Sequence, residues 1–347
     1  MKNESIEPLL TICIPTYSRD AMLDKCLAAL YKIQELGHRF CLIIADNCSE
    51  DNTKNVIQRW QPKFENIETI FQESNLGPDR NMYSLYMAVK TEYCWLLGDC
   101  DTISPEHYAR MEKVLYEGYN VVVINTEPGK LPNERKIYSN IEDFLDEQGW
   151  HVTKLSACVV KKEMLNPIFI KRYFDTHFVQ WGQLMEYLCQ TESINILFEP
   201  SVHLGYLEDN GNYRDNQKGA WRKIPFYVWA KCWSQMILSL PFKIPCELKL
   251  KVIKDHERQF HWFSIRNLLK NKIAYGKSYI ENYKENRTFV RMVSVASPFW
   301  SDVVMYLPVE YLYRLLRPIN NTCKYVWKGT KKHIKKVAKK ILRRGSK

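Results

Sequence analysis

The chain has 347 residues, of which 46% are hydrophobic and 13% aromatic, which excludes an intrinsically disordered protein and allows a full catalytic core. Its formal net charge of +11 at pH 7 is concentrated near the C-terminus, where residues 311–347 carry 13 of the 50 Lys and Arg residues and no Asp or Glu. Because the remaining chain is close to neutral, we do not expect a nucleic-acid-binding enzyme, which would carry its basic surface on the folded body.

The first part of the chain alternates between strands and helices. Short β-rich apolar runs predict strands at residues 9–15, 40–46, 67–72, 93–97 and 120–125. Apolar residues at helical spacing predict the intervening helices at residues 21–36, 52–60, 80–90 and 105–116. This order predicts an α/β fold with a mostly parallel sheet flanked by helices, in which ligands bind at the carboxyl ends of the strands.

The rhythm changes after residue 155. We predict a strand at 154–160, a helix at 173–190 and a strand at 193–204, which would complete the same sheet. Aromatic residues at helical spacing from Trp221 onward predict a helical extension. The predicted organisation is a catalytic domain at 1–212, a helical extension at 213–297 and a membrane-associating tail at 298–347.

Polar loops follow three of the predicted strands, at residues 16–19, 46–51 and 98–101. A parallel sheet would bring these loops together at one edge. Asp99 and Asp101, separated by one residue, can share a hard divalent cation, and Mg²⁺ or Mn²⁺ would use such a site to bridge two phosphates. The sequence contains no Gly-x-Gly-x-x-Gly and no P-loop motif, so the phosphate-binding loops of dinucleotide enzymes and P-loop NTPases are missing.

Four segments together resemble a known family. The stretches TICIPTYSRD, IIADNCSEDNT, NLGPDRN and WLLGDCD occur in the order and at the spacing of the family 2 glycosyltransferases with the GT-A fold. The resemblance is specific over residues 9–116 and looser to about residue 212, where it points to the abequosyltransferase-like branch of surface-polysaccharide sugar transferases. It implies a metal-dependent, inverting transfer of a sugar from a nucleotide diphosphate donor to an acceptor hydroxyl, with a glycan or lipid-linked glycan as acceptor.

The resemblance also implies roles for single residues in donor binding. Pro15, Tyr17 and Arg19 would line the nucleotide pocket, and Asp46 would accept a hydrogen bond from the base. Arg80, in NLGPDRN, would approach the phosphates. Taken alone, Asp46 is also typical of a residue that helps to cap the following helix through its neighbours Asn47 or Ser49, and Arg80 of one that begins a helix.

The metal site that the resemblance implies uses Mn²⁺ or Mg²⁺. Asp99 would contact the ribose or a metal-bound water, and Asp101 would ligate the metal directly. His203 follows a predicted strand and is a candidate for a further metal ligand.

The sequence departs from the family pattern where a general base is expected. The region around residues 174–181 lacks a clear acidic pair, so the candidates are Asp175, His177 and the more distant Glu186. For His177 a structural role, at a helix end or in the core, is an equal alternative.

Cysteine usage and the N-terminus indicate the compartment. The chain has 11 cysteines without a C-x-x-C pair, and several, such as Cys13 and Cys94, lie in apolar runs that are typical of buried thiols in a reducing environment. The first apolar run is too short for a signal peptide. We therefore expect a cytoplasmic protein.

The C-terminal tail has the pattern of a membrane-surface helix. Apolar residues recur at helical spacing between Ile334 and Leu342, and Lys and Arg fill the other face. The upstream segment 298–319 is aromatic and apolar, but its charged residues make it a poor membrane span and a better interfacial segment. We expect peripheral attachment to the inner face of the cell membrane, with a solvated disordered tail as the alternative.

Two other functions remain open from the sequence. A sugar-phosphate nucleotidyltransferase would share the sheet and the metal carboxylates, although it should have a Gly-rich N-terminal loop where this chain has Pro15, Thr16 and Tyr17. A catalytically inactive, membrane-associated scaffold that binds nucleotide sugars is the second alternative.

Overall fold

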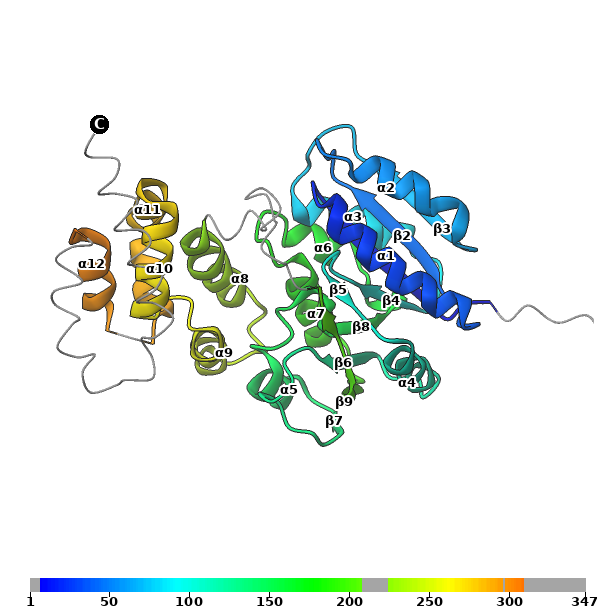
Figure 1. The fold of residues 1–347 in the computed structure, drawn as a ribbon. Coiled ribbons are helices and arrows are strands. Elements are labelled where there is room, and N and C mark those ends of the chain that lie inside the picture. The colour runs from blue at the N-terminus through cyan, green and yellow to red at the C-terminus, as the bar shows by residue number, and fades with distance from the viewer. Residues whose placement is uncertain (1–6, 208–223, 296, 309–347) are drawn as a thin grey trace, which may run out of the picture.

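The computed structural model describes residues 7–207, 224–295 and 297–308. At its centre is an eight-stranded sheet with the strand order β3-β2-β1-β4-β8-β6-β9-β7, and a two-stranded ribbon pairs β10 with β5. Helices flank the sheet, and a group of C-terminal helices lies to one side of it (Figure 1). The architecture is therefore the α/β arrangement that the sequence predicts, with a helical C-terminal region.

The bounds of the elements follow the predicted pattern closely in the first part of the chain. The strands are β1 (Leu10–Thr16), β2 (Cys41–Asp46), β3 (Ile67–Phe71), β4 (Tyr93–Leu96), β5 (Asp101–Thr102), β6 (Val121–Asn125), β7 (Lys136–Tyr138), β8 (Cys158–Lys161), β9 (Ile196–His203) and β10 (Gly205–Tyr206). The helices are α1 (Asp20–Glu35), α2 (Thr53–Trp60), α3 (Pro78–Ala88), α4 (Pro105–Leu115), α5 (Ile141–Gln148), α6 (Pro167–Arg172), α7 (Val179–Gln190), α8 (Trp233–Leu238), α9 (Cys246–Phe260), α10 (Ile265–Tyr275), α11 (Lys277–Val293) and α12 (Pro298–Tyr306). A π-helical segment, Tyr227–Cys232, leads directly into α8.

The strand directions decide where the polar loops meet. β1 pairs in parallel with β2 and β4, β2 with β3, and β6 with β9. Because β8 is antiparallel to both β4 and β6, strands β6 and β9 run in the same direction as β1. The carboxyl ends of β1, β2, β4 and β9 therefore lie along one edge of the sheet, and α7, which leads into β9, begins at that edge.

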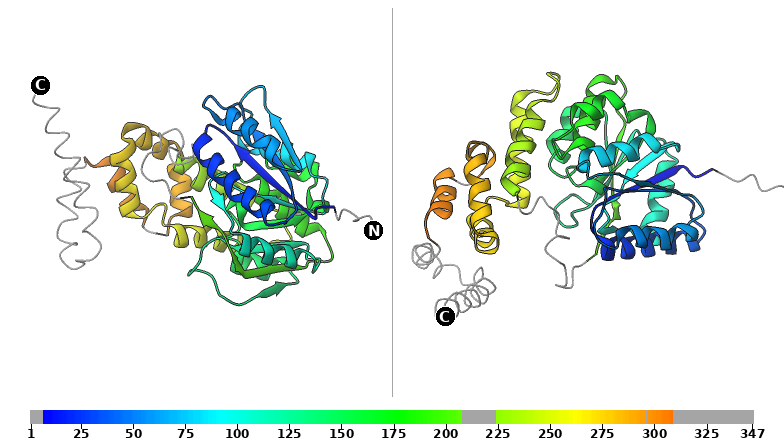
Figure 2. Two further views of the ribbon diagram at one scale, coloured as in Figure 1. Left: turned by 45° about the vertical axis from the view of Figure 1, so that its right-hand side comes forward. Right: turned by 90° about the horizontal axis from the view of Figure 1, so that it is seen from above.

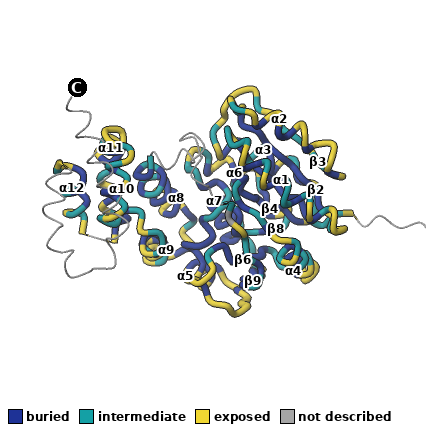
Figure 3. The backbone as a smooth tube through the Cα atoms, viewed as in Figure 1, coloured by how far each residue is buried: buried dark blue, intermediate teal, exposed yellow. Residues whose placement is uncertain are grey.

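Each face of the sheet has its own hydrophobic core, because alternate residues of a strand point to opposite faces. In β1, Ile12 and Ile14 are fully buried in the core that includes residues of α1, α2 and α4, whereas Cys13 belongs to the core on the other face, with residues of α3 and α7. Figure 3 shows the result: the strands are buried, and exposed backbone is found mainly in the outer turns and on the solvent sides of the helices.

The C-terminal helices share the second of these cores. Trp233 of α8 is fully buried, and its ring lies 5.3 Å from that of Phe178 and 5.5 Å from that of Trp181, at the start of α7. α9 contacts α5, and α10, α11 and α12 pack on one another further out. The two views in Figure 2 agree in placing this helical region beside the sheet.

Helix α12 lies at the start of the segment 298–319, which we expected to lie at the membrane interface. Its Asp302 accepts hydrogen bonds from the Arg287 guanidinium at 2.7 Å and from the Tyr283 hydroxyl at 2.6 Å, which fastens α12 to α11. Within the described ranges, no helix combines the length and the apolar character that crossing a bilayer requires. The predicted boundary at 212 and the basic tail from 309 onward lie outside the described residues.

The helix predicted over 173–190 ends as expected but begins later, at Val179. Residues 173–178 form a turn between α6 and α7, in which both Asp175 and His177 have positive φ angles, of 66° and 65°. The predicted strand at 154–160 begins later, after a 3₁₀ turn at Leu155–Ala157. The short elements β5, β7 and α5 were not predicted, because few residues define their period.

Candidate active site

Asp99 joins the loops that follow β1 and β4. It is 4% exposed, and its Oδ2 accepts a hydrogen bond from the Thr16 hydroxyl at 2.9 Å. Arg19 Nη1 lies 3.1 Å from Asp99 Oδ1. Burial raises the pKa of Asp99, and the Arg19 charge and the Thr16 hydroxyl oppose this shift. Both oxygens of Asp99 are thus engaged by the protein.

Asp101 is held differently. It is 3% exposed, and its Oδ2 accepts a hydrogen bond from Ser156 Oγ at 2.5 Å. Its Oδ1 is buried and has no hydrogen-bond partner among the described residues. Burial raises the pKa of Asp101, whereas Lys154 and Ser156 lower it. A buried carboxylate oxygen without a partner fits a hard divalent cation, so Asp101 is the better suited of the two aspartates to ligate Mn²⁺ or Mg²⁺.

Asp46 ends β2 at the same edge and is 3% exposed. Its Oδ1 accepts hydrogen bonds from the amide and the hydroxyl of Ser49, which closes the turn after the strand. Burial raises the pKa of Asp46, and the Ser49 contacts lower it. Asn52, not Asp46, is the residue that precedes α2, so Asp46 does not cap that helix.

The loop that contains Tyr17 and Arg19 is fixed against the loop after β2. Pro15 pairs with Ala45 in the sheet, and the Ser18 amide donates to Ser49 Oγ at 2.7 Å. Tyr17 is 39% exposed. The structure therefore brings the predicted nucleotide-binding residues of both loops to one edge of the sheet.

Arg80 is paired with a residue that we predicted for another role. Its guanidinium makes two hydrogen bonds to the Asp175 carboxylate, at 2.5 and 3.0 Å, and it lies over the Phe174 ring. The Arg80 contact lowers the pKa of Asp175. Arg80, which the sequence assigns to the donor phosphates, thus meets one of the candidate bases in this structure.

His177 lies in the same turn and is fixed through its backbone. Asp79, which is 3% exposed at the start of α3, accepts a hydrogen bond from the His177 amide at 2.9 Å. The His177 ring meets the Tyr227 ring edge-on, with 5.8 Å between centroids. Burial lowers the pKa of His177, while Asp175 opposes this shift. A histidine with a lowered pKa is neutral at pH 7 and can accept a proton.

Glu186 is a structural residue in this fold. It lies within α7, 2% exposed, and its carboxylate accepts hydrogen bonds from Arg172 at 2.5 Å and from the Tyr173 hydroxyl at 2.7 Å. These contacts tie α6 to α7, so the carboxylate is occupied by neighbours within the helical layer. The structure does not bring Glu186 together with the aspartate pair.

His203 lies beside another histidine. Its ring lies edge-on to that of His107, with 5.0 Å between centroids, in a pocket between α1 and the start of α4. No group of three or more His, Cys, Asp or Glu side chains that could hold a metal occurs in the parts of the chain that the structure describes. The structure gives no support to His203 as a metal ligand.

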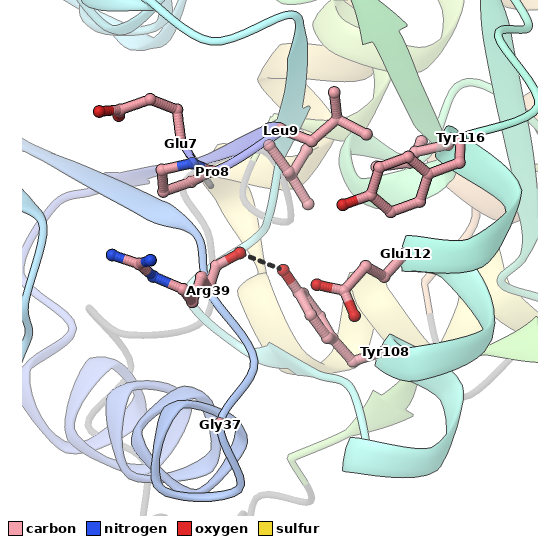
Figure 4. Close-up of a pocket in the computed structure, with 10 residues that line it drawn as sticks. Glu7, Pro8, Leu9, Gly37, Arg39, Tyr108, Glu112 and Tyr116 are labelled. Carbon is pink, nitrogen blue, oxygen red and sulfur yellow. Dashed lines mark hydrogen bonds between the residues drawn. The ribbon is translucent and has the colours of Figure 1, made fainter. Parts of the chain in front are cut away.

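A further pocket lies at the opposite edge of the sheet, near the amino ends of β1 and β2 (Figure 4). Arg39, Tyr108 and Glu112 line it, and the Tyr108 hydroxyl donates to the Arg39 carbonyl at 3.4 Å. None of the predicted site residues lines this pocket.

Comparison with known proteins identifies the family. Residues 11–164, which contain all four of the segments described above, match the model of glycosyl transferase family 2. These residues form a glycosyl transferase family 2 domain. The loops that follow β1, β2 and β4 at the carboxyl edge of the sheet all lie within the matched residues.

Two curated relatives illustrate the family. An abequosyltransferase from Salmonella typhimurium is 30% identical over 109 residues, which cover 31% of this chain and 32% of that protein. A GalNAc(5)-diNAcBac-PP-undecaprenol β-1,3-glucosyltransferase from Campylobacter jejuni is 24% identical over 227 residues, covering 58% of this chain and 72% of that protein. The chain thus matches about a third of the length of the first relative.

Solved structures support the fold. TarS from S. aureus, crystallised with UDP-GlcNAc, aligns with a TM-score of 0.55 at 15% identity over 88% of this chain and 91% of that chain. The mannosyltransferase PcManGT from Pyrobaculum calidifontis aligns with a TM-score of 0.50 at 12% identity, over 92% and 89%. The fold of the family 2 domain is GT-A, as the sequence resemblance implied.

Sequence reasoning missed several residues that hold this site. Ser156, Asn47 and Asp79 are buried and contact the loops that contain the candidate residues. Asn47 could have been found, because it follows Asp46 directly and its amide oxygen accepts from the Leu76 amide at 2.9 Å. Ser156 gave no signal, because it lies 55 residues from Asp101 in a segment without a polar motif.

Proposed function

We propose that this chain transfers a sugar from a nucleoside diphosphate donor to an acceptor hydroxyl. The observation that carries this proposal is the buried aspartate pair at the carboxyl edge, in which Asp101 Oδ1 has no protein partner in the described ranges. Membership of glycosyl transferase family 2 supports it. The two aligned structures, which were solved with UDP-GlcNAc and with GDP-Man and Mn²⁺, favour the same class of donor.

The proposed reaction is a displacement at the anomeric carbon. The acceptor oxygen forms a bond to that carbon, the bond to the diphosphate oxygen breaks, and the nucleoside diphosphate leaves with the electron pair. The acceptor proton passes to a base on the protein. An in-line attack of this kind inverts the anomeric configuration.

In this proposal Asp101 would hold a divalent cation, which would supply charge neutralisation for the diphosphate. Donor phosphates and water would complete the coordination, since Mg²⁺ in such sites keeps few protein ligands. Asp99, whose oxygens are taken by Thr16 and Arg19, shapes the pocket instead of binding the metal directly.

His177 is the base that the geometry favours. Asp175 is ion-paired with Arg80, and Glu186 is ion-paired with Arg172, so both carboxylates already have cationic partners. His177 is positioned at the carboxyl edge by its backbone, and burial lowers its pKa, so its ring is neutral at pH 7. A neutral imidazole is a suitable proton acceptor.

The proposed acceptor is a lipid-linked glycan of surface polysaccharide. The Campylobacter relative acts, by its name, on an undecaprenol diphosphate glycan, and the Salmonella relative is an abequosyltransferase. We further propose that the protein attaches to the inner face of the cell membrane through its basic C-terminal segment. Removal of residues 321–347 should then abolish sedimentation with anionic liposomes at low salt, and equal binding of both forms would contradict this attachment.

Thermal shift with the diphosphates of uridine, thymidine, guanosine and cytidine, with and without Mn²⁺, tests the donor site. One of them should raise the unfolding temperature only when Mn²⁺ is present, because a ligand that binds the native state stabilises it. Asp101→Ala should lose this shift and all transfer, whereas Asp143→Ala, an exposed aspartate on α5, should keep both. Undiminished turnover in Asp101→Ala would overturn the proposal.

A further inference from the structure

Ser156 connects the metal-site loop to the strand layer. It is fully buried in the turn before β8, and its Oγ accepts a hydrogen bond from the Gly98 amide at 2.8 Å. The same Oγ donates to Asp101 Oδ2 at 2.5 Å, and the Ser156 carbonyl accepts from Trp95 Nε1 at 2.9 Å. One residue therefore contacts the end of β4, the glycine before the aspartates and the carboxylate of Asp101.

The hydrogen-bond chemistry gives this contact a direction. A serine hydroxyl has a single proton, and the Gly98 amide occupies one of its lone pairs, so the proton is directed to Asp101 Oδ2. This contact fixes the rotation of the carboxylate. The other oxygen, Oδ1, is buried and has no hydrogen-bond partner within the described residues.

We propose that Ser156 is a positioning residue that fixes the Asp101 carboxylate so that Oδ1 is directed at a divalent cation. This inference rests on the proposed function, because it assumes that the donor is bound with a metal. Residues that orient a metal ligand in this way commonly change metal affinity by about 10- to 100-fold when they are removed.

Gly98 provides an independent constraint on the same carboxylate. A Cβ at residue 98 would lie 3.0 Å from Asp101 Oδ2 and 3.6 Å from Ser156 Oγ. The Gly98→Ala variant would therefore displace the Asp101 carboxylate by a few tenths of an ångström while keeping every polar group of Asp101 and Ser156. It is a second way to disturb the orientation of Asp101 without removing the hydroxyl.

Ser234 offers a matched control. It is also a fully buried serine, but its hydroxyl donates to the Ala230 carbonyl, at 2.6 Å, within a helix of the C-terminal region. Ser156→Ala and Ser234→Ala each remove one buried hydroxyl. Only the first removes a contact to Asp101, so the pair separates metal positioning from a general loss of stability.

The test is a titration of Mn²⁺ into each full-length variant in the presence of the nucleoside diphosphate that binds best, followed by electron paramagnetic resonance of free Mn²⁺. We expect Ser156→Ala and Gly98→Ala to weaken Mn²⁺ binding about 10- to 100-fold, and Ser234→Ala to bind as the wild type does. Unfolding curves in urea, recorded without metal, show whether each variant is folded.

Two outcomes would overturn the inference in distinguishable ways. If the wild type binds Mn²⁺ and Ser156→Ala binds it equally well, the positioning role is wrong and the proposed function stands. If the wild type itself shows no metal-dependent nucleotide binding, the metal part of the proposed function fails, and the role of Ser156 fails with it. If Ser156→Ala does not fold, unchanged Mn²⁺ affinity in Gly98→Ala contradicts the inference.

Discussion

Replacing Arg19 by alanine should destabilise this protein much more than the loss of an exposed surface ion pair would. The Arg19 side chain is 24% exposed and the Asp99 side chain only 5%, with 3.1 Å between Nη1 and Oδ1. At that distance, with an effective dielectric constant of about 20, the attraction between the two charges is about 5 kcal/mol. The Arg19→Ala variant would leave the Asp99 carboxylate buried without its cationic partner, although the Thr16 hydroxyl would still donate to it.

We expect Arg19→Ala to lower the free energy of unfolding by about 3 kcal/mol, the lower end of the range for a buried charge that loses its partner. Asp99→Asn alone should have a smaller effect. The double variant Arg19→Ala/Asp99→Asn should be more stable than Arg19→Ala, because the uncompensated charge is then gone. Urea unfolding followed by tryptophan fluorescence gives all three values.

Arg80→Ala is the matched control. It breaks the Arg80–Asp175 pair, whose side chains are 41% and 71% exposed, and should cost less than about 1 kcal/mol. The deficit of Arg19→Ala should also grow as the pH rises above the ordinary pKa of an aspartate. Without Arg19 the pKa of native Asp99 would rise further above its value in the unfolded chain. A carboxyl group with a raised native pKa stabilises the fold only while it is protonated, so this contribution is lost as the pH increases through the native pKa. A loss in Arg19→Ala no larger than in Arg80→Ala would refute this reasoning.

Three further predictions concern the donor pocket, the base and the turn that contains it. Asp46→Ala should weaken binding of the nucleoside diphosphate by about 1–3 kcal/mol in calorimetric titration, and unchanged affinity would leave Asp46 as a turn residue only. His177→Ala should lower turnover strongly while donor binding survives, whereas Glu186→Gln should mainly lower the urea midpoint of unfolding. Normal turnover in His177→Ala together with a strong loss of turnover in Glu186→Gln would reassign the base to Glu186. Burial raises the pKa of Asp79 to about 6, so this carboxyl group favours the native state only at low pH, where it is protonated. Asp79→Asn should therefore raise the free energy of unfolding by up to about 3 kcal/mol at pH 7.5 and by less at pH 5. An equal gain at both pH values would contradict the assignment to Asp79.

The sequence alone predicted the first half of the fold and most of its candidate site. The apolar strands before Asp46 and Asp99 have a clear period, and parallel strands place their carboxyl ends at one edge, so the meeting of these loops follows from local pattern and topology. The family resemblance rested on the same segments and was confirmed. Boundaries of α1, α2 and α4 differ from the predicted ones by about one residue, because each helix is amphipathic over its whole length.

Only the tertiary structure decided which groups these side chains meet. Asp99 and Asp101 are alike in sequence, yet one is neutralised by Arg19 and the other is held by Ser156 with an oxygen left over. Glu186 is a more distant candidate for the base in the sequence, and its partner Arg172 is brought to it by the turn between α6 and α7. Partners of this kind come from distant segments, and their charge, burial and direction depend on how the layers pack. Periodicity reports which face of an element is buried, but it contains no information on the side chain that will face it from another element.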